Sequence, residues 1–196
     1  MKKLLFMRHG LLEKNYQDYS ILGFKDLENL LTKKVISKID REKTKHFLLK
    51  KDLIKEVNLI ISSTELRAME TGEMVKSLIS AESETSSDLN EIIFYEGIIS
   101  KEDVEKHDFD YLRREILTKF FNSVSSEDFN SAQRRFLHFL DSVKKLEYEN
   151  ILCITHGWFM RLISIYKMKK TLNDISLQDL LDAPVPSFLE IIEINE

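Results

Sequence analysis

The chain has 196 residues, of which 43% are hydrophobic, and a formal net charge of −4. The length predicts a single domain, residues 1–196, and the apolar content excludes a disordered chain. The weak negative charge excludes the basic surface of a nucleic-acid-binding protein. A single cysteine, Cys153, leaves no internal disulfide, and no apolar run is long enough for a signal peptide or a membrane span. We therefore expect a cytoplasmic protein that binds neither nucleic acid nor a membrane.

The first predicted element is a short buried strand at Leu4–Met7, followed at once by Arg8, His9 and Gly10. In open α/β sheets, ligands bind beyond the carboxyl ends of strands, and a glycine there lets a ligand approach the backbone. These three residues are a candidate reaction centre, although a charged strand exit with a surface histidine explains them equally well. Asn15 follows seven residues after Arg8 and is either a donor to a phosphate oxygen or a turn residue.

A helical region is predicted next, after a turn at Gly23–Asp26. From about Asn29 to Lys55, apolar residues recur at helical spacings among many lysines. The pattern predicts one amphipathic helix, or two with a break near Ile39–Lys43. The lysines alternate with acidic and apolar residues, which favours a solvated helix surface over a binding patch.

The second predicted buried strand leads into a helix that begins with an arginine. The elements are a strand at Val57–Ile61, a cap at Ser63 or Thr64, and a helix that ends near Ile79. Arg67 then lies in the first helical turn, where free backbone N–H groups and a guanidinium together favour an anion. The alternative is a surface arginine that pairs with Glu70 or Glu73 on its own helix.

The middle of the chain contains one candidate acid and one candidate covering segment. Ser80–Ser87 is polar and is predicted to be a loop, and Glu91 follows it beside apolar residues, where desolvation would raise its pKa. An exposed loop glutamate is the alternative. Residues 94–130 have helical patterning and are predicted to form a helical insertion over the site, with a specificity role. The pairs Arg113-Arg114 and Arg134-Arg135 are interpreted as exposed helix faces.

The last third of the chain repeats the arrangement of strand, histidine, glycine and turn. A third buried strand at Asn150–Ile154 delivers Thr155, His156 and Gly157. The elements predicted around it are a helix at about Phe129–Glu147 capped by Ser125 or Ser126, an apolar helix at Phe159–Tyr166, a short helix at Ser176–Leu181 and a final strand at Ser187–Ile194.

Alternating strands and helices predict a mainly parallel sheet, which would bring these strand ends to one edge. Arg8, His9, Arg67 and His156 would then surround a site suited to a dianionic phosphoryl group. The sequence has no phosphate-binding glycine loop and no acidic metal cluster. We therefore expect phosphoryl transfer without metal or cofactor, through a covalent intermediate on histidine. The second ring nitrogen of His9 is expected to donate to a backbone carbonyl, that of Gly10.

Four motifs in this order resemble the histidine phosphatase superfamily, which includes the cofactor-dependent phosphoglycerate mutases. They are Arg-His-Gly, Ser-Ser-x-x-x-Arg-Ala-x-x-Thr, Leu-Asn-Glu and Thr-His-Gly, and the resemblance runs from Leu4 to about Leu162. It implies a three-layer α/β/α sandwich with a mainly parallel central sheet. It also implies that His9 is the nucleophile, that Glu91 is the proton donor, and that the phosphate is held by Arg8, Asn15, Arg67, His156 and Gly157.

Three functions compete at this stage. The first is a metal-independent phosphomonoester hydrolase acting on a small phosphorylated metabolite or a phosphoprotein. The second is a phosphoglycerate mutase. Against it, Ile92 and Ile93 follow Glu91 at the two positions where the mutases have Arg-His. The third is a catalytically inactive phosphate-binding regulator or scaffold, against which the complete set of site residues argues. The sequence predicts neither the substrate nor the oligomeric state.

Overall fold

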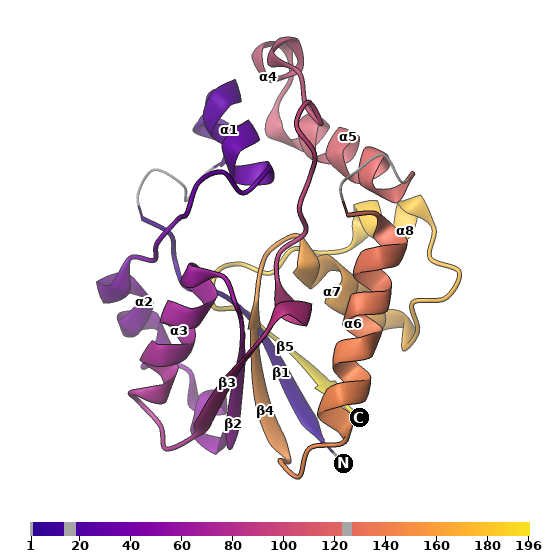
Figure 1. Cartoon of the computed structure of the whole chain (residues 1–196). Coiled ribbons are helices and arrows are strands. Elements are labelled where there is room, and N and C mark those ends of the chain that lie inside the picture. Colours follow the sequence, from indigo (N-terminus) through magenta and orange to yellow (C-terminus); the bar gives the residue numbers. More distant parts are fainter. Residues whose placement is uncertain (1, 14–18, 123–126) are drawn as a thin grey trace.

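The computed structural model describes residues 2–13, 19–122 and 127–196. In this part of the chain, five strands form one sheet in the order β3-β2-β4-β1-β5 (Figure 1). Strands β3, β2, β4 and β1 run parallel to one another, and β5 is antiparallel to β1. The strands are β1 (Lys3–Arg8), β2 (Leu59–Ser63), β3 (Glu82–Ser86), β4 (Asn150–Thr155) and β5 (Ile191–Asn195).

Helices cover both faces of the sheet. Side chains alternate between the two faces along each strand, and apolar side chains on both faces must be buried. Leu4 and Phe6 share a buried cluster with residues of α6 and α7, whereas Leu5 and Met7 share one with residues of α2 and α3. A strand buried on both faces reads as one continuous apolar run. The helices are α1 (Phe24–Leu31), α2 (Arg41–Leu48), α3 (Leu66–Lys76), α4 (Lys101–Lys106), α5 (Phe109–Phe121), α6 (Phe129–Lys144), α7 (Phe159–Lys169) and α8 (Leu177–Asp182). The expected three-layer sandwich with a mainly parallel sheet is confirmed.

The predicted turn at Gly23–Asp26 is wrong, because α1 begins at Phe24 with Gly23 as its N-cap. Asp26 lies in the first turn, where an acidic side chain stabilises the helix dipole.

The region expected to be one or two helices, about Asn29–Lys55, contains the last residues of α1, then α2, then a 3-10 helix at Asp52–Glu56. Residues 32–40 separate α1 from α2, so the break begins earlier than the predicted position near Ile39–Lys43. Asp40 caps α2 by accepting a hydrogen bond from the Lys43 N–H, 3.1 Å away.

Strand β2 lies two residues later than predicted, because Ser62 and Ser63 are buried parts of the strand. Helix α3 has Glu65 as its N-cap and ends at Lys76, so the predicted caps and the end at Ile79 are wrong. The Ser63 hydroxyl still accepts a hydrogen bond from the Glu65 N–H at 3.1 Å.

The predicted loop at Ser80–Ser87 is also wrong, because Glu82–Ser86 forms strand β3 at the edge of the sheet. Most of its side chains are exposed, so the strand has no apolar pattern from which to recognise it. Charged residues on an edge strand also discourage pairing with other chains. Strand β5 begins at Ile191, four residues after the predicted start at Ser187.

The helices expected in residues 94–130 are present as α4 and α5. Asp128 caps α6 through a hydrogen bond from the Ser131 N–H at 2.6 Å, whereas the predicted caps Ser125 and Ser126 lie outside the described residues.

Figure 1 shows α1, α4 and α5 beyond the carboxyl ends of β1, β2 and β4. The candidate site therefore lies between the sheet and these helices. None of the helices in the described ranges is long and apolar enough to cross a membrane.

Candidate active site

Two histidines and one arginine from three strand ends meet at the carboxyl edge of the sheet. The rings of His9 and His156 lie 5.2 Å apart between centroids. Arg67, in the first turn of α3, donates from Nε to Nε2 of His9 at 3.2 Å and to Nδ1 of His156 at 3.0 Å. The structure thus brings together the three strand ends that the sequence pattern placed at one edge.

The hydrogen bonds of His9 fix its tautomer. Nδ1 lies 2.9 Å from the Gly10 carbonyl oxygen, as expected, so Nδ1 carries the proton and donates. Nε2 therefore has a free lone pair, which accepts the hydrogen bond from Arg67. Burial, with the charges of Arg67 and Arg8 adding to it, holds the pKa of His9 well below its usual 6.5. The imidazole is neutral at physiological pH, the state that a nucleophile requires.

The tautomer of His156 follows from a chain of hydrogen bonds. The Ser63 hydroxyl donates to Oδ1 of Asn90 at 2.8 Å, so it accepts from Nε2 of His156, also at 2.8 Å. Nδ1 then has no proton and accepts from Arg67. Burial, followed by the Arg67 charge, lowers the pKa of His156 well below 6.5. Both rings are thus neutral and direct a nitrogen lone pair at the same guanidinium.

A carboxylate on the other side of Arg67 holds that guanidinium in place. Oε2 of Glu65 lies 2.8 Å from Nη2 of Arg67, and Oε1 accepts hydrogen bonds from Lys33 and from the Glu91 N–H. The alternative pairing of Arg67 with Glu70 or Glu73 is not what the structure has. Glu70 instead accepts from Arg41 and from the Ile39 N–H.

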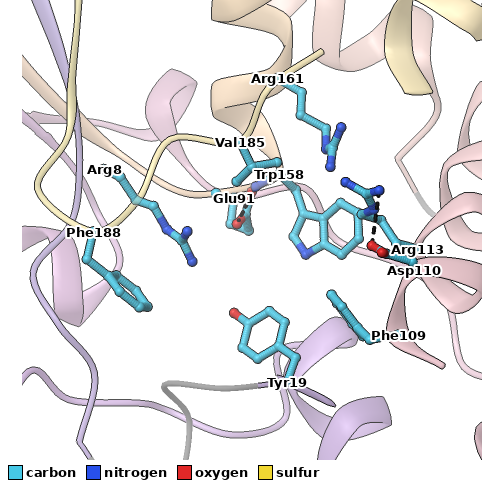
Figure 2. Close-up of a pocket in the computed structure, with 11 residues that line it drawn as sticks. Arg8, Tyr19, Glu91, Phe109, Asp110, Arg113, Trp158, Arg161, Val185 and Phe188 are labelled. Atoms are coloured by element: carbon cyan, nitrogen blue, oxygen red, sulfur yellow. Dashed lines mark hydrogen bonds and ion pairs between the residues drawn. The ribbon is translucent and has the colours of Figure 1, made fainter. Parts of the chain in front are cut away.

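Arg8 is held against the segment that precedes β5. Nη1 donates to the Pro186 carbonyl at 3.0 Å, and the guanidinium lies over the Phe188 ring, 4.1 Å from its centroid (Figure 2). Burial lowers the pKa of Arg8, although Tyr19 and Glu91 oppose this shift. A Cβ atom at position 157 would lie 3.1 Å from Cζ of Arg8, so Gly157 leaves the room that the guanidinium occupies.

Glu91 is buried at the N-terminus of α7. Oε1 accepts from the N–H groups of Ile92 at 3.1 Å and Phe159 at 2.8 Å, and Oε2 accepts from the Trp158 N–H at 3.1 Å. Burial raises the pKa of Glu91, as desolvation was expected to do, whereas the Arg67 charge opposes the rise. The exposed-loop alternative for Glu91 is excluded, because the side chain is 9% exposed.

A cavity of about 290 Å³ opens beside these groups (Figure 2). Its wall combines charged residues with four aromatic rings, which suits a small ligand that has an anionic end. The lining residues are Arg8, Tyr19, Glu91, Phe109, Asp110, Arg113, Gly157, Trp158, Arg161, Val185 and Phe188.

Asn15, predicted to assist in binding phosphate, lies outside the described residues. Within the described ranges, no group of three or more His, Cys, Asp or Glu residues is placed to hold a metal ion.

Comparisons with known proteins identify the family of the chain. A sequence profile of the histidine phosphatase superfamily (branch 1) matches residues 4–182. The chain belongs to the histidine phosphatase superfamily. No curated protein matches the sequence significantly.

Solved structures of this superfamily's fold align with the whole chain. YhfR from Bacillus stearothermophilus is 22% identical, with a TM-score of 0.67 over 100% of this chain and 91% of that one. A mycobacterial glucosyl-3-phosphoglycerate phosphatase in complex with VO3 is 15% identical, with a TM-score of 0.66 over 100% and 91%. A phosphoserine phosphatase mutant from Entamoeba histolytica, in complex with phosphoserine, is 18% identical, with a TM-score of 0.62 over 98% and 90%. At these identities the likeness shows the shared fold alone.

Two arginines that were interpreted as exposed helix faces are partly buried instead. Arg113 lines the cavity, whereas its neighbour Arg114 is exposed. Arg135 donates from Nη1 to the carbonyls of Asp88 at 2.8 Å and Asn90 at 2.7 Å, so it holds the segment that leads to Glu91. In a pair of adjacent arginines on a helix, the sequence does not show which side chain faces the protein interior and which faces solvent.

Sequence reasoning missed three further site residues, namely Lys33, Glu65 and Tyr19. Lys33 stands in a lysine-rich stretch, and Glu65 looks like any acidic residue near a helix start. Tyr19 lies in a short 3-10 helix and directs its hydroxyl into the cavity (Figure 2). Only the fold brings these side chains to the strand ends. The partly buried position of Glu65 between Arg67 and Lys33 is therefore visible only in the structure.

Proposed function

We propose that the chain is a metal-independent phosphomonoester hydrolase that forms a covalent phosphohistidine on His9. The observation that carries this proposal is the orientation of the His9 ring. Nδ1 is fixed by the Gly10 carbonyl, while Nε2 presents its lone pair to Arg67. A neutral, oriented imidazole beside cationic donors is the arrangement that nucleophilic attack on a phosphoryl group requires.

The reaction has two steps. In the first, Nε2 of His9 attacks phosphorus, the ester P–O bond breaks, and Glu91 gives its proton to the departing oxygen. In the second, water attacks the phosphorus of the phosphohistidine, Glu91 takes a proton from that water, and the N–P bond breaks. The products are the free alcohol, inorganic phosphate and neutral His9. The raised pKa of Glu91 supports the first role, and its three N–H donors stabilise the carboxylate needed for the second.

Arg8 and Arg67 supply the charge that stabilises the phosphoryl oxygens. Both guanidiniums are held by other groups, Arg8 by Phe188 and Arg67 by Glu65. Fixed cations need little reorganisation as charge develops in the transition state. A bound dianion would also favour the protonated form of His156, whose Nδ1 would then become a third donor.

A small phosphorylated metabolite is the substrate class that the site favours over a phosphoprotein. The cavity of about 290 Å³ is of a size for a compact molecule. Two of the structural neighbours, a glucosyl-3-phosphoglycerate phosphatase and a phosphoserine phosphatase, are named for small phosphorylated compounds. These names support a phosphatase acting on a metabolite, and the compound itself is a matter for substrate screening.

The test is the chemical identity of the labelled intermediate. After incubation with a phosphate ester labelled with ³²P and a rapid quench without acid, the label should be stable in base and labile in acid, as phosphohistidine is. His9→Ala should lose both the label and turnover, whereas His46→Ala, on the exposed surface of α2, should keep both. Label on a serine, cysteine or aspartate instead would overturn the assignment.

Metal independence is tested separately. Activity should survive treatment with EDTA, because the proposed charge stabilisation comes from Arg8 and Arg67. A loss of activity that magnesium or zinc restores would contradict the metal-free mechanism while leaving the phosphohistidine in place.

A further inference from the structure

Lys33 is held in a backbone conformation that lysine rarely adopts. It directly follows Thr32, the C-cap of α1, and has a φ of 56°, in the left-handed region. The Lys33 N–H donates to the Leu30 carbonyl at 3.3 Å, and the Lys34 N–H donates to the Asn29 carbonyl at 2.9 Å. This pair of bonds is the Schellman motif, in which glycine is usual because a Cβ atom is unfavourable there. A lysine kept in this conformation points to a use for its side chain.

The Lys33 side chain reaches from the end of α1 to the candidate active site. Its Nζ lies 2.5 Å from Oε1 of Glu65 and also donates to the carbonyl oxygen of Glu91. The side chains of Lys33 and Glu65 are 19% and 17% exposed, so water screens this ion pair less than a pair on the open surface. Lys33 therefore contacts both the carboxylate that holds Arg67 and the main chain of the proposed acid.

The charge of Lys33 matters because Glu65 also pairs with Arg67. Oε2 of Glu65 lies 2.8 Å from Nη2 of Arg67. A guanidinium balanced by a carboxylate attracts an anion less strongly than one that is not. With Lys33 on the other carboxylate oxygen, the three side chains carry one net positive charge instead of none. The phosphoryl site thus keeps the positive potential that Glu65 would otherwise cancel.

We propose that Lys33 is a positioning residue for phosphoryl transfer, which shares the Glu65 carboxylate with Arg67 and fixes the main chain at Glu91. Sharing the carboxylate leaves Arg67 both oriented and positively charged for the phosphoryl oxygens. The bond to the Glu91 carbonyl holds the proposed acid beside them. The inference rests on the proposed function and adds a residue that does not line the cavity.

The same arrangement predicts a signature in the pH profile. The charged and titratable groups that face Glu91 are Arg8, Tyr19, Lys33, Glu65 and Arg67. Burial raises the pKa of Glu91; the Arg67 charge opposes this rise, the Glu65 charge adds to it, and the Lys33 charge opposes it. Removal of Lys33 should therefore raise the pKa of Glu91 further. Because the acid must be protonated, the alkaline limb of kcat should move to higher pH.

Glycine is the substitution that separates the side chain of Lys33 from its backbone conformation. Lys33→Gly removes the ammonium group and relieves the left-handed strain, so the protein should remain folded, as thermal unfolding would show. Its kcat should fall by about 10- to 100-fold, and the alkaline limb should move to higher pH. Lys33→Arg keeps the positive charge and should restore most of kcat and the original limb. If the glycine variant is not folded, Lys33→Met takes its place in every comparison.

Lys170 provides a matched control. It is the C-cap of α7, with a φ of 59°, and its side chain is exposed. Lys170→Gly therefore relieves the same kind of strain and removes the same charge at a place away from Glu65 and Glu91. It should change neither kcat nor the alkaline limb.

Binding of inorganic phosphate, measured by calorimetry, is a readout that does not depend on turnover. Lys33→Gly should bind phosphate about 3- to 10-fold more weakly than the unmodified protein, because a dianion loses the attraction of one nearby charge. Lys170→Gly should bind it equally well. Weaker binding by Lys33→Gly in a protein that turns over no ester would support Lys33 and overturn the hydrolase.

Two results would overturn the role of Lys33 and leave the hydrolase standing. The first is a Lys33→Gly protein with unchanged kcat and unchanged phosphate affinity. The second is a loss of kcat that Lys33→Arg does not restore and that leaves the alkaline limb in place, because a contact with a purely structural role would behave in that way.

Discussion

The Glu91 carboxyl combines two opposing influences in one side chain. Burial favours its neutral form and raises its pKa, whereas N–H groups of Ile92, Trp158 and Phe159 favour its ionised form. A group balanced in this way can both release and regain a proton during one catalytic cycle. The importance of this proton should depend on how readily the leaving group departs without one.

Glu91→Gln should therefore affect esters unequally. An alkyl phosphate leaves as a basic alkoxide and needs a proton, so its turnover should fall by about 10²–10⁴. A nitrophenyl phosphate leaves as a stabilised phenolate and should lose much less. Steady-state rates on both esters decide the matter, with inhibition by inorganic phosphate as a control for binding. Equal losses on the two esters, with inhibition unchanged, would remove Glu91 from the acid role.

Arg67 is the residue that contacts both site histidines, through Nε to His9 and His156. Arg67→Ala should lower turnover by about 10²–10³, the typical effect of removing one preorganised donor to a transition state. His46→Ala and His138→Ala are matched controls, because both side chains are exposed. Comparable small effects of all three substitutions on turnover would argue against a role for Arg67 in charge stabilisation.

At the scale of elements, the start of α3 is tied to the segment that carries Glu91. Glu65 contacts Arg67 and Lys33 and accepts a hydrogen bond from the Glu91 N–H at 2.8 Å. Asn90 adds a second link, because Oδ1 accepts from the Thr64 N–H at 3.0 Å. The proposed acid and the proposed phosphoryl-binding arginine are therefore positioned by one shared carboxylate.

Glu65→Gln should reveal this coupling in the pH profile. The charge of Glu65 contributes to the raised pKa of Glu91, so its removal should lower that pKa. Since the acid must be protonated, the alkaline limb of kcat should move to lower pH. Arg67 would also lose the carboxylate that holds its guanidinium in place, so kcat should fall by about 10- to 100-fold. Glu73→Gln, exposed on the same helix, is the control. An unshifted alkaline limb would limit Glu65 to a purely structural role.

The elements that the sequence predicted well are those with strong local patterns. The buried strands β1, β2 and β4 each contain an apolar run, and each leads into a motif of the site. Strand β3 was missed because its exposed residues are polar and its pairing with β2 is decided by neighbours distant in sequence. The start of α1 was missed because Gly23 resembles a turn residue but serves as a helix N-cap.

Of the site itself, sequence order predicted the residues that closely follow the buried strands but not Arg113 and Arg161. His9, Arg67 and His156 follow strands, so parallel pairing brings them together. Arg113 and Arg161 come from α5 and α7, and their shared cavity depends on how these helices pack. No periodicity in the sequence contains that information.

At the scale of the whole molecule, the two buried neutral histidines make stability depend on pH. An unfolded histidine has a pKa of about 6.5, whereas the pKa values of His9 and His156 in the folded protein are well below it. Below about pH 6.5 the unfolded state therefore binds more protons, and the free energy of unfolding falls as pH falls. Each histidine contributes up to about 1.4 kcal/mol per pH unit.

Glu91 acts in the opposite direction, because its raised pKa makes the folded state take up this proton at a higher pH than the unfolded state does, so the free energy of unfolding rises as pH falls through that range. Denaturant unfolding between pH 7 and pH 5 should therefore show a net loss of stability, which Glu91→Gln makes steeper. His46→Asn, at an exposed position, should leave the slope unchanged. A flat profile between these pH values would contradict the neutral, buried state of the two histidines.

The order of the strands in the sheet also bears on how the chain reaches its fold. Leu4 of β1 pairs with Ile151 of β4 and Ile194 of β5, so β1 is synthesised well before both of the strands that pair with it. Contacts between such distant residues require large loops to close, and proteins dominated by them fold in milliseconds to seconds. During synthesis, the apolar side chains of β1 remain without their sheet neighbours until residues 150–195 have left the ribosome. We therefore expect the nascent chain to depend on chaperones over that interval.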